Sequence, residues 1–331
     1  MSFLPKNWGL HHTASDSLAD LGLVANANAT PIVPAVAGCP RLPPSPIRIS
    51  YDGHASMSNA TVDVNWIVSH LGDPNARFVE VDVSPATYER GHIPGAVVWD
   101  AYKDLRDATY QPVSRAALEA LIGRSGIRPD TTVAMYGYGA ALGFWLLKAH
   151  GHSDVRMLLE SRDQWEQAGQ RWETKSQWPA ATDYRFAGDW ADLLAERADV
   201  RRSMEDPSVA LVDVRSELEY DGERFWPSGA TADAGRAGHV PGAINVPISR
   251  LQTDSGDLAP VEELRRVFDS ARVSPEQTVI TYCTIGNRAS LAWFALKYLL
   301  GYPNVQVYYG SWVDWGKRTD TPIAGEAQPA S

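Results

Sequence analysis

Three residues toward the C-terminal end of the chain have the types and spacing needed for thiol chemistry. Cys283, Gly286 and Arg288 lie in the segment QTVITYCTIGNRASLAWFALKYLL, which covers residues 277–300. The β-branched residues before the cysteine predict a strand, and the apolar residues after the arginine predict a helix. A cysteine at the carboxyl end of a parallel strand lies where such sheets bind ligands, beside the free N–H groups of a helix N-terminus. The glycine permits a tight turn, so the segment predicts a loop that surrounds a sulfur atom with hydrogen-bond donors.

The composition limits the class of protein that carries this loop. The chain has 331 residues, of which 44% are apolar and 21% charged, values typical of a soluble globular protein with two domains. A formal charge of −10 argues against a nucleic-acid partner. No apolar run is long enough for a membrane span, and the first fifteen residues do not resemble a secretory signal. The only two cysteines, Cys39 and Cys283, fit a reducing compartment, so we expect a cytoplasmic protein in which Cys39 has no chemical role.

The chain repeats itself after about residue 56. The interval from His92 to His239 is longer than the interval from Asp82 to Asp213, which indicates an insertion in the second copy around DGERFWPSGATADAG (221–235). Five blocks keep the same order in both copies, so we interpret them as a duplication. The pairs are FVEVDV (78–83) with VALVDV (209–214), GHIPGAVVW (91–99) with GHVPGAINV (238–246), TTVAMYG (131–137) with QTVITYC (277–283), LKAHGHSDV (147–155) with LKYLLGYPNV (296–305), and Trp165 with Trp315.

Strands and helices alternate within each copy, which predicts an α/β fold with mostly parallel sheets flanked by helices. Helices are expected at 114–126, 261–271 and 290–301. The predicted organisation is an irregular N-terminal extension over 1–55, a supporting domain over 56–185, a catalytic domain over 186–320 and a tail over 321–331.

The two copies differ at the positions that could do chemistry. Aligning TTVAMYG with QTVITYC places Gly137 opposite Cys283, and Ser84 stands opposite Arg215. One copy therefore carries both a thiol and a basic residue, and the other carries neither. We infer one active domain and one supporting domain.

The sequence resembles the tandem-domain rhodanese family of sulfurtransferases from about residue 56 to 320. The motifs that carry the resemblance are VDVRS (212–216), GHVPGAINVP (238–247), CTIGNR (283–288) and YYGSWVDWG (308–316). The resemblance implies two rhodanese-like domains, the first inactive, and a thiosulfate sulfurtransferase that forms a persulfide on Cys283. The loop matches neither the Cys-Arg-Lys-Gly form nor the Cys-Gly-Ser-Gly form of the family, and looks most like an actinobacterial group with Cys-x-Ile-Gly-x-Arg. 3-Mercaptopyruvate therefore stays open as the alternative donor.

Substrate contacts are expected from the loop and from two arginines. Arg288 is predicted to hold the anionic end of the donor, because a guanidinium suits sulfonate or carboxylate oxygens. Arg215 is the second candidate, with an ion pair to Asp213 or Glu217 as the alternative. Arg224 and Arg236 are weaker candidates in the inserted segment. The remaining predicted substrate-binding residues are Thr284, Ile285, Gly286 and Asn287.

Other polar and aromatic residues are assigned to the scaffold. We expect His92 and His239 to bond the backbone of a Pro-Gly turn, since a catalytic base is not needed in both copies. Asp82 and Asp213 are expected to tie backbone or a basic residue at strand ends. Trp312 and Trp315 are expected to pack the last helix against the sheet.

Two rival functions share parts of this pattern. A cysteine phosphatase normally has five residues between cysteine and arginine, whereas four separate Cys283 from Arg288, so no aryl phosphatase activity is expected. A non-catalytic rhodanese-like module would leave the intact cysteine, glycine and arginine unexplained. No ligand cluster surrounds Cys283, so neither a metal nor a cofactor is expected. The predicted partners are a small-molecule sulfur donor and a thiophilic acceptor, with no membrane or nucleic acid, and an acidic, duplicated chain fits a monomer.

Overall fold

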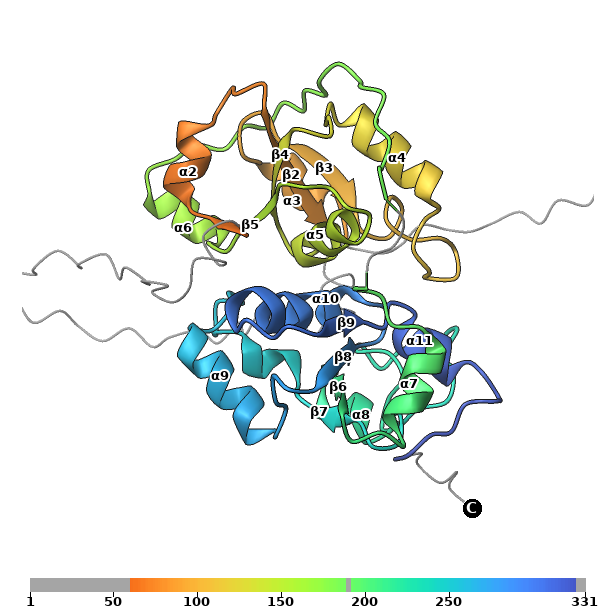
Figure 1. Cartoon of the computed structure of the whole chain (residues 1–331). Coiled ribbons are helices and arrows are strands. Elements are labelled where there is room, and N and C mark those ends of the chain that lie inside the picture. Colours follow the sequence, from red (N-terminus) through yellow and green to blue (C-terminus); the bar gives the residue numbers. More distant parts are fainter. Residues whose placement is uncertain (1–59, 189–191, 326–331) are drawn as a thin grey trace, which may run out of the picture.

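The computed structural model describes residues 60–188 and 192–325, which form two α/β domains stacked one on the other (Figure 1). The extension predicted over 1–55, with Cys39, lies outside the described residues. The tail is predicted over 321–331, and its last six residues also lie outside the described part of the chain. The predicted limits of the two domains stay predictions.

The first domain is built on a five-stranded parallel sheet. Its strand order is β1-β5-β4-β2-β3, so consecutive strands need helical crossovers, as the alternating pattern predicted. The strands are β1 (Thr61–Val62), β2 (Ala76–Asp82), β3 (Val97–Asp100), β4 (Thr132–Tyr136) and β5 (Val155–Leu158).

The second domain repeats this arrangement with four parallel strands in the order β7-β6-β8-β9. A single parallel bridge between Leu194 and Val307 takes the edge position that β1 holds in the first sheet. The α/β fold with two parallel sheets is thus confirmed. The strands are β6 (Val209–Asp213), β7 (Ile244–Asn245), β8 (Thr278–Tyr282) and β9 (Val305–Val307).

Helices flank both sheets in the same sequence order. The predicted helices at 114–126 and 261–271 are confirmed as α4 (Arg115–Arg124) and α9 (Val261–Ser270). The helix predicted at 290–301 begins earlier, as α10 (Asn287–Phe294), and continues as a π-helical turn, η3 (Ala295–Leu299). The others are α2 (Val64–Ser69), α3 (Ala86–Arg90), α5 (Ala140–Ala149), α6 (Arg162–Gln167), α7 (Arg197–Ser203), α8 (Glu217–Tyr220), α11 (Ser311–Gly316) and the 3₁₀ turn η2 (Ile248–Leu251).

Helices α5 and α10 form the interface between the domains (Figure 1). Nine of the ten residues of α5 are buried, because one side of this apolar helix covers its own sheet and the other faces α10. Phe144 contacts Phe294 edge to face at a centroid distance of 5.0 Å, and Trp145 stacks on Tyr309 at 5.5 Å. The loops that precede α5 and α10 are thereby brought to the same interface.

The strand register corrects the predicted alignment of the two copies. Val79 pairs with Val97 and Met135, whereas Val212 pairs with Ile244 and Thr281, which occupy the same places in the second copy. Val79 therefore corresponds to Val212, and the insertion before His239 is slightly shorter than the predicted alignment gives.

Two predicted equivalences are wrong for the same reason. Glu80, and not Asp82, corresponds to Asp213, and Asp82, and not Ser84, stands opposite Arg215. The predicted alignment matched Asp82 with Asp213 because both are aspartates. The correct alignment depends on which strand residues pair, and the sequence alone does not reveal that pairing.

The predicted scaffold residues are buried, with one corrected detail. Trp312 and Trp315 are fully buried in the second domain, as expected. His92 and His239 each donate a hydrogen bond from Nδ1 to the carbonyl of Tyr88 or Tyr220 and stack on the ring of that tyrosine, so the predicted bond to a Pro-Gly turn is wrong. The same His–Tyr pair in both copies supports a structural role.

The helices of the described residues are all too short or too polar to cross a lipid bilayer.

Candidate active site

Cys283 is the first residue after β8 and lies at the carboxyl end of the second sheet. Its side chain is buried, with the residue 1% exposed. Its backbone N–H donates to Ser311 Oγ at 3.2 Å, and its carbonyl accepts from Trp312 N at 2.9 Å. Both bonds come from the start of α11, so the position of the sulfur is fixed by the strand and by this helix.

The loop after Cys283 turns back on the sulfur at Gly286. This glycine has φ +99°, a left-handed conformation that β-carbon-bearing residues rarely adopt. Its backbone N–H donates to Cys283 Sγ at 3.1 Å, just where α10 begins. An N–H group aimed at the sulfur from a helix N-terminus favours negative charge on that atom or on a sulfur bonded to it.

Arg288 lies on the first turn of α10 and is held by a carboxylate. Its Nη1 and Nη2 each donate to Glu219 at 2.8 Å, and Nη2 also donates to Thr284 Oγ1 at 2.6 Å. Thr284 in turn donates to Glu219 Oε1 at 2.7 Å. The three side chains therefore form one network beside the sulfur, in which a buried carboxylate balances the charge of Arg288.

Glu219 is fully buried and ionised. Burial by itself raises the pKa of a carboxyl group, but the charge and hydrogen bonds of Arg288, with Arg215 and Thr284, outweigh this and hold the pKa of Glu219 at about 2. The sequence offered no strong signal for this residue. The pattern SELE after Arg215 is typical of a capping box, and it predicts that Glu219 lies in the first turn of a helix, here α8.

Arg215 is enclosed in the second domain. It is 0% exposed and donates to Asp213 through Nε at 3.0 Å and Nη2 at 2.6 Å, and to the Gly238 carbonyl at 2.7 Å. Its guanidinium also lies 4.3 Å from the ring centre of Trp312. The ion pair with Asp213 is thus present, and its predicted contact with a substrate anion stays a prediction.

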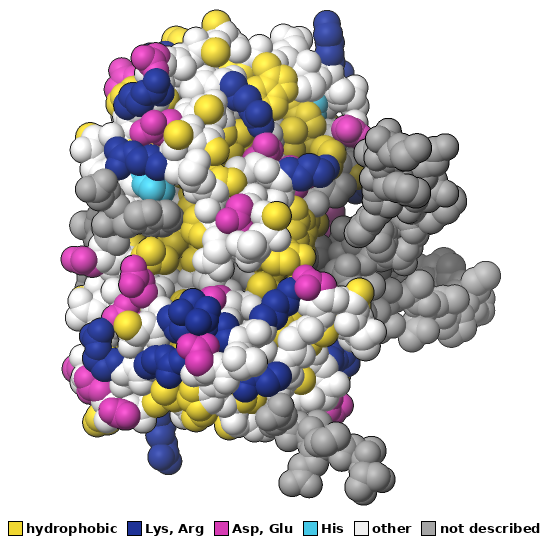
Figure 2. All heavy atoms as spheres, turned by 90° about the vertical axis from the view of Figure 1, so that its right-hand side faces the viewer, with side chains coloured by type: hydrophobic (Ala, Val, Ile, Leu, Met, Phe, Trp, Pro, Cys, Tyr) yellow, Lys and Arg dark blue, Asp and Glu magenta, His cyan; other side chains and the backbone are white. Residues whose placement is uncertain are grey.

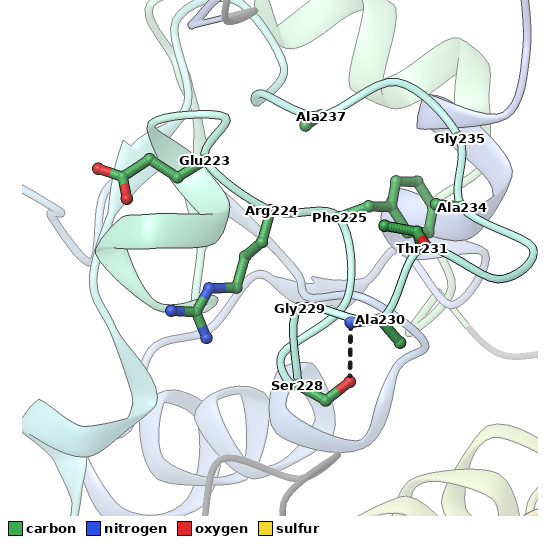
Figure 3. Close-up of a pocket in the computed structure, with 10 residues that line it drawn as sticks. All are labelled: Glu223, Arg224, Phe225, Ser228, Gly229, Ala230, Thr231, Ala234, Gly235 and Ala237. Carbon is green, nitrogen blue, oxygen red and sulfur yellow. Dashed lines mark hydrogen bonds between the residues drawn. The ribbon is translucent and has the colours of Figure 1, made fainter.

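The arginines of the inserted segment are also engaged with protein groups. Arg224 donates to the Pro227 carbonyl at 2.6 Å and lines an open cavity of about 470 Å³ formed by residues between 223 and 237 (Figure 3). Arg236 donates to the carbonyl and hydroxyl oxygens of Thr321 at 2.9 and 2.8 Å, which ties the segment to the C-terminal part of the domain.

Arg106 of the first domain reaches the loop and was not predicted. It is 3% exposed and donates to the Ile285 carbonyl through Nε at 3.1 Å and Nη2 at 3.0 Å. Nη2 also donates to Asn287 Oδ1 at 2.5 Å, and Nη1 to the Ala101 carbonyl at 2.6 Å. The first domain thus contacts the loop through the Ile285 carbonyl and the Asn287 side chain. The indication in the sequence was a difference between the two copies: the position equivalent to Arg106 in the second copy is Gln252.

The equivalent loop of the first domain faces the cysteine loop across the interface. Gly137 holds the place of Cys283, and the next residue, Tyr138, lines the same cavity between the domains as Arg288. Burial raises the pKa of Tyr138, and the charge of Arg288 opposes this. The site is therefore built by both domains.

The comparisons with known proteins agree with this architecture. A family model described as "Rhodanese-like domain" matches residues 63–168 and 196–318. The chain belongs to the rhodanese-like family. Both copies of the domain, and not only the one with the cysteine, match the family model.

Relatives extend the likeness over most of the chain. A protein of Haloferax volcanii named "Putative thiosulfate sulfurtransferase" is 37% identical over 274 residues, which cover 79% of this chain and 95% of the relative. "Sulfur carrier protein TtuD" of Thermus thermophilus is 38% identical and covers 80% and 95%.

Among solved structures, an anaerobic ergothioneine biosynthesis enzyme from Chlorobium limicola superposes with a TM-score of 0.73 at 23% identity. The match covers 82% of this chain and 71% of that enzyme. At this identity the likeness shows a shared fold.

Proposed function

We propose that this rhodanese-like protein is a sulfurtransferase that moves a sulfane sulfur from thiosulfate to a thiophilic acceptor through a persulfide on Cys283. The observation that carries the proposal is the Gly286 N–H donated to Cys283 Sγ in a loop at the carboxyl end of β8. The names of the relatives support sulfur transfer as the class of reaction. A cytoplasmic location, expected from the cysteine content, belongs to the same proposal.

The first step forms the persulfide. The Cys283 thiolate attacks the outer sulfur of thiosulfate, the S–S bond of the donor breaks, and sulfite leaves with the bonding electron pair. The terminal sulfur of the persulfide then carries the charge that the thiolate carried before. The loop N–H groups are suited to hold that charge, since a helix N-terminus stabilises anions.

The second step returns the enzyme to its starting state. A thiolate or cyanide attacks the terminal sulfur, the S–S bond to Cys283 breaks, and its electrons remain on Cys283 as thiolate. Neither step needs a metal or an external oxidant, because the sulfane sulfur passes between nucleophiles without net change in electrons.

Arg288 is proposed to orient the anionic end of the donor. It lines a cavity between the two domains, while Glu219 fixes its guanidinium plane. Glu219 offsets the charge of Arg288. Arg288 would therefore orient the donor mainly by N–H hydrogen bonds to its anionic end, and less by net electrostatic attraction. Arg215 is buried behind the site, and it would support the site through its ion pair with Asp213 and not through direct contact with the donor.

Steady-state assays with cyanide as acceptor test the donor. Thiocyanate formation with a kcat/KM at least tenfold higher for thiosulfate than for 3-mercaptopyruvate is expected. The reverse preference would keep the persulfide and replace the donor. Robust hydrolysis of p-nitrophenyl phosphate, with no thiocyanate from either donor, would contradict sulfur transfer in favour of phosphatase chemistry.

A further inference from the structure

A cavity of about 680 Å³ lies between the domains, next to the cysteine loop. From the first domain it is lined by the carboxyl ends of the strands, including Glu80 and Tyr136. From the second domain it is lined by Asn287 and Arg288 at the start of α10, just after the cysteine loop, and by the segment 252–258 after η2. The cavity therefore connects the inactive strand-end site with the loop that holds Cys283.

Three polar groups that line this cavity lack hydrogen-bond partners. Glu80 is 1% exposed, and neither of its carboxylate oxygens makes a hydrogen bond; burial raises its pKa, which the Tyr136 hydroxyl and Arg162 only partly oppose. The nearest cation is Arg162, whose Nη1 lies 3.6 Å from Glu80 Oε2 and is itself buried without a hydrogen bond. Asn287 Nδ2 is a third buried donor without a partner. Buried polar groups are nearly always paired, so unpaired groups on one cavity indicate a ligand.

The charge of the cavity favours a cationic ligand. Two arginines line it, and each already has a carboxylate partner: Arg162 lies 3.6 Å from Glu80, and Arg288 is paired with Glu219. The acidic character is local, because Lys and Arg are interspersed with Asp and Glu over the face shown in Figure 2. The carboxylates that line the cavity are Glu80, Asp82, Glu160, Asp163, Asp254 and Asp257.

A metal ion is a poorer match than an organic cation. Within residues 60–188 and 192–325, no three His, Cys, Asp or Glu side chains are grouped closely enough to hold one. Ammonium groups need fewer ligands, and three N–H donors suit Glu80 together with Asp82 at the end of β2. Burial raises the pKa of Glu80 to about 7, and an ammonium bound beside it would favour the ionised carboxylate.

We propose that this cavity binds the ammonium group of a small aminothiol, which is the acceptor of the Cys283 sulfur. The ammonium lies at Glu80 and Asp82, and the thiol points to the loop at Asn287 and Arg288. The inference rests on the proposed function. In the transfer, the acceptor thiolate bonds to the terminal sulfur of the persulfide, the Cys283 S–S bond breaks, and Cys283 keeps the electron pair as thiolate.

Binding is tested first, in a variant that cannot react. Calorimetry on the Cys283→Ser protein would compare cysteamine with 2-mercaptoethanol, its uncharged analogue. Cysteamine is expected to bind at least tenfold more tightly, and Glu80→Gln in the same background is expected to remove most of that difference. Equal binding of the two thiols, or a preference that survives Glu80→Gln and Asp82→Asn, overturns the site.

Single-turnover kinetics test the acceptor role. The protein is loaded with sulfur from thiosulfate, and the decay of the persulfide is followed with cysteamine, 2-mercaptoethanol or 3-mercaptopropionate. Glu80→Gln is expected to slow transfer to cysteamine at least tenfold more than transfer to 2-mercaptoethanol. The matched control is Glu205→Gln, an exposed residue after α7, which should leave the ratio of the two rates unchanged.

The outcomes separate the two proposals. An equal slowing for all three thiols would refute the aminothiol site while leaving sulfur transfer intact. Selective binding of cysteamine without any persulfide from thiosulfate or 3-mercaptopyruvate would refute the proposed function, and with it the acceptor role of this ligand.

Discussion

The loops after β4 and β8 occupy equivalent places in the two domains and differ in every side chain that matters for sulfur chemistry. Gly137 and Tyr138 follow β4, whereas Cys283 and Thr284 follow β8. Strand, turn and helix are shared, so reactivity depends on a few side chains placed on an unchanged scaffold. The first loop carries no thiol, but it faces the second across the interface.

The buried charges of the two copies differ in a complementary way. In the second domain, Asp213 and Arg215 form an ion pair in which both oxygens of Asp213 accept hydrogen bonds. In the first, Glu80 corresponds to Asp213, but Asp82 takes the place of Arg215, and Glu80 makes no hydrogen bond and has only a longer ion pair with Arg162 at 3.6 Å. A pair with several hydrogen bonds stabilises structure, whereas a carboxylate without a hydrogen bond on a cavity is available for a ligand. This difference agrees with the binding role proposed above for the first-domain end of the cavity.

The largest effect is expected from Glu219→Gln, which removes the α8 carboxylate that binds Arg288 in the second domain. Arg288 would keep its charge in a buried place without an ionised partner. Such losses typically cost about 3–5 kcal/mol, so the urea unfolding midpoint should fall sharply. The double variant Glu219→Gln/Arg288→Leu should recover much of that loss, because Leu142 stands at the equivalent position of the first domain. A Glu219→Gln protein as stable as the wild type would show that the network is not integral to the loop.

A smaller effect concerns Glu80 and the dependence of stability on pH. Burial raises the pKa of Glu80 from 4.5 to about 7, so between these values the folded state binds more protons than the unfolded state. The free energy of unfolding must therefore fall as the pH rises through this window. Glu80→Gln removes this term, so the variant should gain on the wild type by up to about 3 kcal/mol between pH 4 and pH 8. Unfolding curves at several pH values measure the difference, and a constant difference would mean that Glu80 does not titrate there.

The smallest effect is expected from Arg106→Met, which removes the contacts that the first domain makes with the loop after Cys283. The Ile285 carbonyl and Asn287 would lose their donor, and the loop would hold Cys283 less well. Misplacement of reacting groups by up to 1 Å costs up to about 100-fold, so the rate of persulfide formation should fall about 10-fold or somewhat more. Arg106→Lys should recover part of the rate, and Arg128→Met, a surface change in the same domain, should have no effect. An unchanged rate in Arg106→Met would make the two domains chemically independent.

The sequence predicted the repeated α/β scaffold and the position of Cys283, because strand and helix periodicity and the Cys–Gly–Arg spacing are local properties. It could not predict Glu219 or Arg106. Their contacts join segments that are 69 and 179 residues apart. The register of β2 and β6 was missed because a shift of two residues keeps each strand's buried face and matches an aspartate with an aspartate. Contacts between domains and strand register depend on the tertiary fold, which one sequence does not display.

The most direct test of the central claim is the intact mass of the reduced protein after brief exposure to thiosulfate, with Cys283→Ser as control. The account predicts a gain of one sulfur atom that cyanide removes and that the variant does not show. No gain with either thiosulfate or 3-mercaptopyruvate, or the same gain in Cys283→Ser, would contradict a persulfide on Cys283.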